Sequence, residues 1–121
     1  MVRAILDSNI LIDFLRQVEP AVAELRGYDD IAISVVTWIE VMTEVEPDKQ
    51  ADTMRFLRRY SVLPLDDRVS EATVAIRRST RLKLPDAIIL ATARVSGRLL
   101  VTRDVKAFDP DDPGIRIPYR L

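Results

Sequence analysis

The chain has 121 residues, a length that fits one compact domain over residues 1–121, and its 48% hydrophobic and 31% charged residues are typical of a globular protein. It contains no cysteine and no histidine, which excludes disulfides, thiolate metal sites, the Ser-His-Asp triad and nearly every catalytic zinc site. The net charge of −1 creates no overall field toward nucleic acid. Gly27, Gly97 and Gly114 lie too far apart for the usual phosphate-binding loops.

The hydropathy pattern gives no sign of membrane association. No apolar stretch reaches the roughly 18 residues that a membrane-spanning helix needs. The first residues, MVRAILDSN, lack the basic and then apolar layout of a signal peptide, because Asp7 comes too early. We therefore expect a cytoplasmic protein without a membrane partner.

Strands and helices alternate in the first half of the chain. The apolar run VRAIL predicts a buried strand at 2–6, and the helical spacing in SNILIDFLR predicts a helix at 8–16. The next elements are a helix from Glu19-Pro20 to Gly27, a strand near 31–33, a helix at 35–45 capped by Ser34, and a helix at 47–60 that Pro47 opens.

The alternation continues in the second half. We expect a strand at 61–65, ended or kept at a sheet edge by Pro64, a helix from Asp66 or Asp67 through Leu82, a helix from Pro85 to Gly97, a strand at 98–102, and a short strand at 115–117 after the turn-rich loop DPDDPG. This order predicts an α/β protein, an α/β/α sandwich with a mostly parallel central sheet of four to five strands. Sheets of this kind bind ligands at the carboxyl ends of their strands.

Four acidic residues are notable for where they fall. Asp7 directly follows the first strand, and Asp104 follows the strand at 98–102 by two residues. Asp86 lies in the first turn of an almost wholly apolar helix, where the positive end of the helix dipole favours an anion. Glu40 lies inside the apolar helix VVTWIEVMTEV, so its side chain should point into the protein or a cleft.

Each of these acids also has a simpler structural explanation. Asp7 and Asp86 could cap helices, Asp104 could belong to a turn, and Glu40 could pair with an arginine. If the four converge, however, two carboxylates about 4 Å apart repel by ~4 kcal/mol at an effective dielectric of ~20. A divalent cation such as Mg²⁺ or Mn²⁺ would relieve that repulsion and could activate a water for attack on a phosphodiester.

The segments AILDSNILIDFL, ISVVTWIEV, LPDAIILATA and LLVTRDVKAF resemble, in order and spacing, the four acidic motifs of PIN domains, in particular those of VapC-type ribonuclease toxins. The resemblance covers nearly the whole chain. It implies a PIN-like parallel sheet between helices, with an acidic pocket for one or two Mg²⁺ or Mn²⁺ ions. It also implies an endoribonuclease that leaves a 5′-phosphate and a 3′-hydroxyl.

The resemblance assigns roles to individual residues. Asp7, Glu40, Asp86 and Asp104 match the catalytic and metal-binding acids, of which the fourth is the least strict in the family. Asn9 and Thr102 match polar positions that orient the metal, its water or the acids. Asp13 and Asp109 lie near these motifs without matching a family position.

The resemblance also implies partners. VapC-like toxins form homodimers and are inhibited by a small antitoxin whose tail lies across the active-site groove and which carries the DNA-binding part. The RNA substrate could be held locally by one of three basic groups, although solvated surface is the simpler explanation for most of them. These groups are Arg55, Arg58 and Arg59; Arg77, Arg78, Arg81 and Lys83; and Arg103 and Lys106.

Other functions remain to be weighed against a toxin nuclease. A stand-alone RNA-processing PIN nuclease and a non-catalytic PIN-like module that binds RNA or a partner protein both stay open. A phosphatase with an aspartyl nucleophile is disfavoured, because the second acid of its DxD motif would fall on Asn9. A response-receiver domain is disfavoured too, because LDSN lacks the adjacent acids that such domains carry after the first strand.

Overall fold

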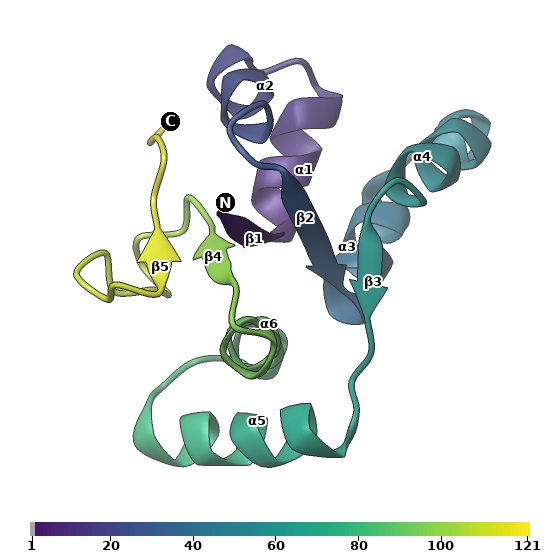
Figure 1. Ribbon diagram of the computed structural model, residues 1–121. Coiled ribbons are helices and arrows are strands. Elements are labelled where there is room, and N and C mark those ends of the chain that lie inside the picture. The colour runs from purple at the N-terminus through teal and green to yellow at the C-terminus, as the bar shows by residue number, and fades with distance from the viewer. Residues whose placement is uncertain (1) are drawn as a thin grey trace.

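The computed structural model describes residues 2–121 and shows a five-stranded parallel sheet with the order β3-β2-β1-β4-β5 (Figure 1). The strands are β1 (Arg3–Leu6), β2 (Asp30–Ser34), β3 (Ser61–Leu63), β4 (Leu99–Val101) and β5 (Ile115–Arg116). The helices are α1 (Ser8–Leu15), α2 (Glu19–Leu25), α3 (Val35–Glu44), the 3-10 helix η1 (Pro47–Lys49), α4 (Gln50–Leu57), α5 (Asp67–Ser79) and α6 (Leu84–Ser96). The predicted α/β fold with helices on both faces is confirmed.

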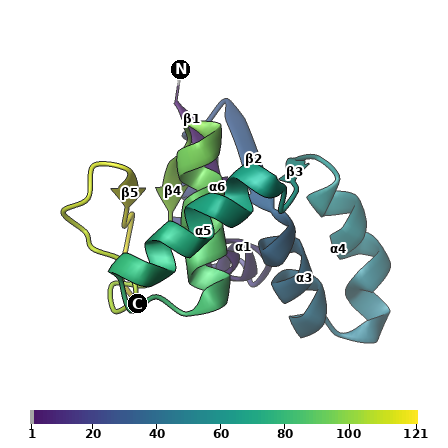
Figure 2. The same cartoon turned by 90° about the horizontal axis from the view of Figure 1, so that it is seen from below.

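Two separate cores show how the helices cover the sheet. Successive side chains of β1 point to opposite faces, so Ala4 and Leu6 join one hydrophobic cluster and Ile5 joins the other. The first cluster contains α1, α2, α3 and α4, and the second contains α5 and α6. Figures 1 and 2 show α5 crossing α6 on the face of the sheet that the second cluster covers. No helix within residues 2–121 is long and apolar enough to cross a bilayer.

Most element ends follow the predicted signals, with two differences. The helix predicted at 47–60 is split into η1 and α4, and α5 ends at Ser79 instead of continuing to Leu82. Thr80 takes an extended backbone there, and its Oγ1 donates to the carbonyl of Ile76, which satisfies one of the last carbonyls of α5. Of the two alternatives for the start of α5, Asp66 is the cap, since its Oδ1 accepts from the Val69 N–H at 2.9 Å.

The chain reverses its direction across the sheet at β1. The first three strands follow one another toward one edge, whereas β4 pairs with the other side of β1. The carboxyl ends of β1 and β4 are directly joined, because the Asp7 N–H donates to the Val101 carbonyl at 2.9 Å. Since ligands of open α/β sheets bind at such a point, the topology places Asp7 and the segment 102–104 at the expected edge.

Candidate functional site

Asp7 both caps a helix and ends a buried strand. Its Oδ1 accepts a hydrogen bond of 2.8 Å from the Ser8 backbone N–H at the start of α1. Its Oδ2 accepts from Thr102 Oγ1 at 2.7 Å and from Asn9 Nδ2 at 3.2 Å. The residue is only 4% exposed. Asp7 can therefore be both a helix cap and a buried carboxylate at the carboxyl edge of the sheet.

The charge of Asp7 is not balanced by a nearby cation. Its donors are all neutral, and no lysine or arginine of residues 2–121 forms an ion pair with it. Burial is the largest influence and raises the pKa of Asp7, while hydrogen bonds from Thr102 and Ser8 lower it. The charges of Asp86 and Glu40 raise it again, and the resulting pKa is about 6 instead of 3.8. The fold thus favours a proton or a cation at this carboxylate.

Glu40 on α3 and Asp86 in the first turn of α6 share this environment. Burial raises the pKa of Glu40, and the charge of Asp86 raises it further. Burial also raises the pKa of Asp86, the charge of Asp104 adds to this effect, and Lys83 opposes it. Glu40 Oε1 is buried and has no hydrogen-bond partner in the described chain. The charges of acids from four separate segments therefore influence one another.

Asp104 has a structural task as well. Its Oδ1 accepts hydrogen bonds of 3.1 Å from the backbone N–H groups of both Lys106 and Ala107, so it caps the turn after β4. Its own N–H donates to Thr102 Oγ1 at 3.2 Å. The turn explanation for Asp104 is thus correct, and its charge still reaches Asp86.

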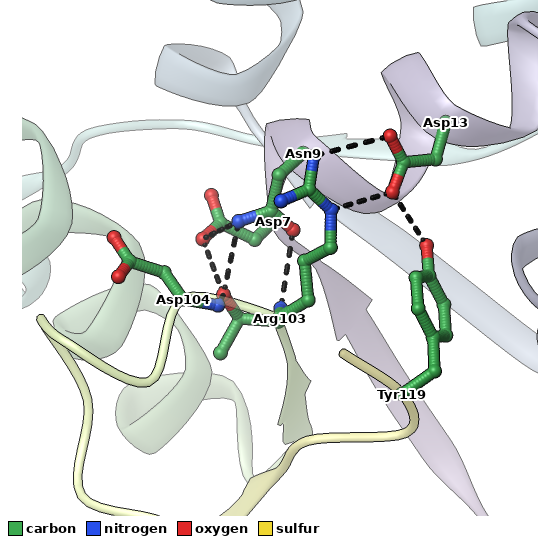
Figure 3. A network of polar contacts seen from close by, with 7 residues as sticks. Asp7, Asn9, Asp13, Arg103, Asp104 and Tyr119 are labelled. Atoms are coloured by element: carbon green, nitrogen blue, oxygen red, sulfur yellow. Dashed lines mark hydrogen bonds and ion pairs between the residues drawn. The ribbon is translucent and has the colours of Figure 1, made fainter. Parts of the chain in front are cut away.

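Asn9 and Thr102 join the ends of β1 and β4. Asn9 Nδ2 donates to Thr102 Oγ1 at 3.2 Å as well as to Asp7, and Asn9 Oδ1 accepts from the Arg103 N–H at 3.2 Å (Figure 3). Thr102 is fully buried. These bonds fix the orientation of the Asp7 carboxylate.

A second buried acid, Asp13, was not assigned a role from the sequence. Arg103 binds it with two hydrogen bonds, Nε to Oδ2 at 2.6 Å and Nη2 to Oδ1 at 3.2 Å, and the Tyr119 hydroxyl donates to Oδ2 at 2.8 Å (Figure 3). We call Asp13, Arg103 and Tyr119 the clamp. Because the Arg103 backbone also bonds to Asn9, the clamp ties α1 and the C-terminal segment to the turn that carries Asp104.

The acid cluster fits a divalent cation by its chemistry. Among residues 2–121 no three acidic side chains have the spacing of a preassembled metal cage. The donor set nevertheless consists of carboxylate oxygens, which Mg²⁺ and Mn²⁺ prefer. The partnerless Glu40 Oε1 and the uncompensated charge of Asp7 are the two features that a bound cation would satisfy.

Comparison with known proteins supports the same interpretation. Residues 4–111 match the PIN domain family. The chain is similar to one in a toxin–antitoxin complex from Klebsiella pneumoniae, with 38% identity, a TM-score of 0.90, and coverage of 98% of this chain and 99% of that chain. No curated protein matches the sequence significantly.

Two more distant structures share the fold. FitAcB from Neisseria gonorrhoeae has 24% identity, a TM-score of 0.79, and coverage of 98% of this chain and 99% of that chain. VapBC2 from Rickettsia felis, bound to a DNA fragment from its promoter, has 18% identity, a TM-score of 0.77 and coverage of 96% of both chains. Since the match to the PIN domain family extends over most of the chain, this chain belongs to that family.

Proposed function

We propose that this PIN domain is a Mg²⁺- or Mn²⁺-dependent endoribonuclease and the toxin of a toxin–antitoxin pair. The observation that carries the nuclease proposal is the buried Asp7 carboxylate, which faces the charges of Glu40 and Asp86 without a compensating cation. A site of this kind suits an enzyme without histidine, because metal-bound carboxylates can carry out the proton chemistry of phosphodiester hydrolysis.

The residues that would hold the cation are Asp7, Glu40, Asp86 and Asp104, for one or two ions. When bound, Mg²⁺ or Mn²⁺ supplies polarisation of a phosphoryl oxygen and activation of a water for in-line attack. The chain itself supplies orientation: Thr102 and Asn9 both donate to Oδ2 of Asp7, and the Ser8 N–H donates to Oδ1.

The nuclease proposal is tested by incubating the purified protein with RNA and Mg²⁺, with and without a chelator. We expect cleavage that stops with the chelator and in the Asp7→Asn and Asp86→Asn variants, because each removes a charge from the cluster. Asp48→Asn is the matched control, since Asp48 is an exposed acid of η1 outside the cluster. Cleavage that persists in both site variants would refute the assignment. A folded protein that cleaves no RNA would favour the non-catalytic binding module.

The toxin role rests on the similarity to the Klebsiella pneumoniae toxin–antitoxin complex. We propose a small antitoxin that occupies the active-site groove and carries the contact with DNA, a homodimer of this chain, and action in the cytoplasm. Induced expression in bacteria should arrest growth with the wild-type chain and not with Asp7→Asn. Co-expression of the protein encoded directly upstream should restore growth. Cleavage without arrest, and without such a neighbour, would favour a stand-alone RNA-processing nuclease.

A further inference from the structure

A cavity of about 530 Å³ lies beside the acid cluster. One wall is the connection from α5 to α6 at 80–83, and the other is the loop at 104–112 after β4. Asp86 and Asp104 both line it, so the cavity opens directly onto two of the four acids. Its volume lies within the range of small-molecule binding sites.

The lining combines apolar side chains with basic residues and with the carboxylates of Asp86, Asp104, Asp109 and Asp112. The apolar part consists of Leu82, Leu90, Ala107, Phe108 and Ile115. Arg81, Lys83 and Lys106 are exposed at the edges, and none of the three has an ion-pair partner in the part of the chain that the structure describes. The fourth cation, Arg94, is paired with Asp112 at 3.4 Å.

Most of the other basic residues considered for RNA binding are less suitable. Arg103 is held by Asp13, and Arg77 Nη1 donates to the Leu82 carbonyl at 3.0 Å. Arg55 forms an ion pair with Asp52 on α4. Figures 1 and 2 both show α4 at the opposite end of the molecule from the α5–α6 connection, so the basic group on and next to α4 lies on a part of the chain away from this cavity.

We propose that this cavity binds a nucleotide of single-stranded RNA next to the phosphodiester bond that is cleaved. The base would rest on the apolar lining, and the flanking phosphates would contact Lys83, Lys106 and Arg81. A cavity with an apolar lining and separate cations suits a nucleotide better than an acidic peptide, whose charged side chains offer little for the apolar part. The inference rests on the proposed nuclease function and specifies which residues hold its substrate.

The test measures binding of a short, fluorescently labelled single-stranded RNA by anisotropy. All proteins carry Asp7→Asn to prevent cleavage, and the salt concentration is varied between about 50 and 200 mM. Lys83→Gln and Lys106→Gln should each weaken binding about five-fold and reduce the slope of log K against log salt by about 0.7. Arg59→Gln is the matched control, because it removes an exposed charge, in the turn after α4, that has no ion-pair partner within residues 2–121, and it should change neither quantity.

A second variant separates the base from the phosphates. Leu82→Gln should weaken RNA binding a few-fold and leave the salt slope unchanged, because it removes apolar contact and no charge. Equal effects of Lys83→Gln and Arg59→Gln would overturn the inference while leaving the nuclease intact. The inference would also be overturned if the cavity variants weakened binding of an acidic peptide and left RNA binding unchanged. A wild-type protein that neither binds nor cleaves RNA would overturn the proposed function itself.

Discussion

Two buried aspartates near the start of the chain have opposite electrostatic surroundings. Asp7, at the N-cap of α1, is 4% exposed, and Asp13, inside the same helix, is 2% exposed. Asp13 accepts two hydrogen bonds from a guanidinium and one from a phenol, whereas Asp7 accepts only from neutral donors. Burial alone therefore does not determine the state of a carboxylate in this fold.

The two pKa values reflect this difference. Burial raises the pKa of Asp13, but the hydrogen bonds from Arg103 and Tyr119, together with the charge of Arg103, outweigh it and leave the pKa below its usual value. Burial and the charges of Asp86 and Glu40 raise the pKa of Asp7, hydrogen bonds from Thr102 and Ser8 lower it, and the result is a pKa of about 6. The negative charge of Asp13 is neutralised by Arg103, so Asp13 has a structural role. The charge of Asp7 has no such partner, which is the property expected of a cation ligand.

The same substitution at the two positions should have opposite effects on stability. Asp13→Asn should lower the free energy of unfolding at neutral pH by about 2–3 kcal/mol, because it leaves Arg103 half-buried without its anion. Urea unfolding in the presence of a chelator measures it. The folded-state pKa of Asp13 lies below its ordinary value. Asp13 therefore stabilises the fold fully at pH values above that ordinary pKa, and this stabilisation is lost as the pH falls through the folded-state pKa. The deficit should therefore shrink in acid, and a deficit independent of pH would contradict the role of the ion pair.

Asp7→Asn should instead stabilise the metal-free protein at pH 7–8 by about 2 kcal/mol. The folded-state pKa of Asp7, about 6, lies above its ordinary value of 3.8. Between these two pH values the native state therefore binds more protons than the unfolded state. The stabilisation of the fold by protonated Asp7 is fully present below about pH 4 and is lost as the pH rises through about 6. The gain of the variant over the wild type should therefore appear across this interval in urea unfolding. A variant less stable than the wild type at pH 8 would contradict the unmet charge.

Tyr119→Phe should have the smallest effect. It removes one hydrogen bond from Asp13 and keeps the ring and the Arg103 ion pair, so the loss of stability should be about 1 kcal/mol. Tyr28→Phe is the matched control, since it removes a similar hydrogen bond, from the Tyr28 hydroxyl to Glu24. The loss of stability in the two variants is compared by thermal unfolding. A loss for Tyr119→Phe as large as that for Asp13→Asn would show that the hydroxyl, not the ion pair, holds the clamp.

Sequence signals predicted the parts of this molecule that depend on local chemistry. The apolar runs gave the strands, Ser34 and Asp66 are caps, and Pro64 directly follows the edge strand β3. Asp7 was recognised because a carboxylate at the end of a buried strand is unusual. Because ligands bind at the carboxyl ends of parallel strands, the position of Asp104 after the fourth strand predicts that it lies at the same edge of the sheet as Asp7.

The clamp could not be predicted, because its partners lie far apart in the chain. Asp13 is 90 residues from Arg103 and 106 from Tyr119. From the sequence, Arg103 was instead a candidate for RNA binding, and only the fold shows that its charge is already used. The same is true of the cavity, whose two walls come from separate segments and distinguish Lys83 and Lys106 from the other basic residues.

Binding of Mn²⁺, followed by isothermal titration calorimetry at pH 7.5 on chelator-treated protein, tests the central claim most directly. Asp7, with its acidic neighbours, should bind the ion in the wild type and in the exposed control Asp48→Asn. Binding should be lost or weakened at least ten-fold in Asp7→Asn and Asp86→Asn, since each removes a carboxylate ligand. Equal Mn²⁺ affinity in the wild type and Asp7→Asn would show that the uncompensated charge at the end of β1 is not a cation site.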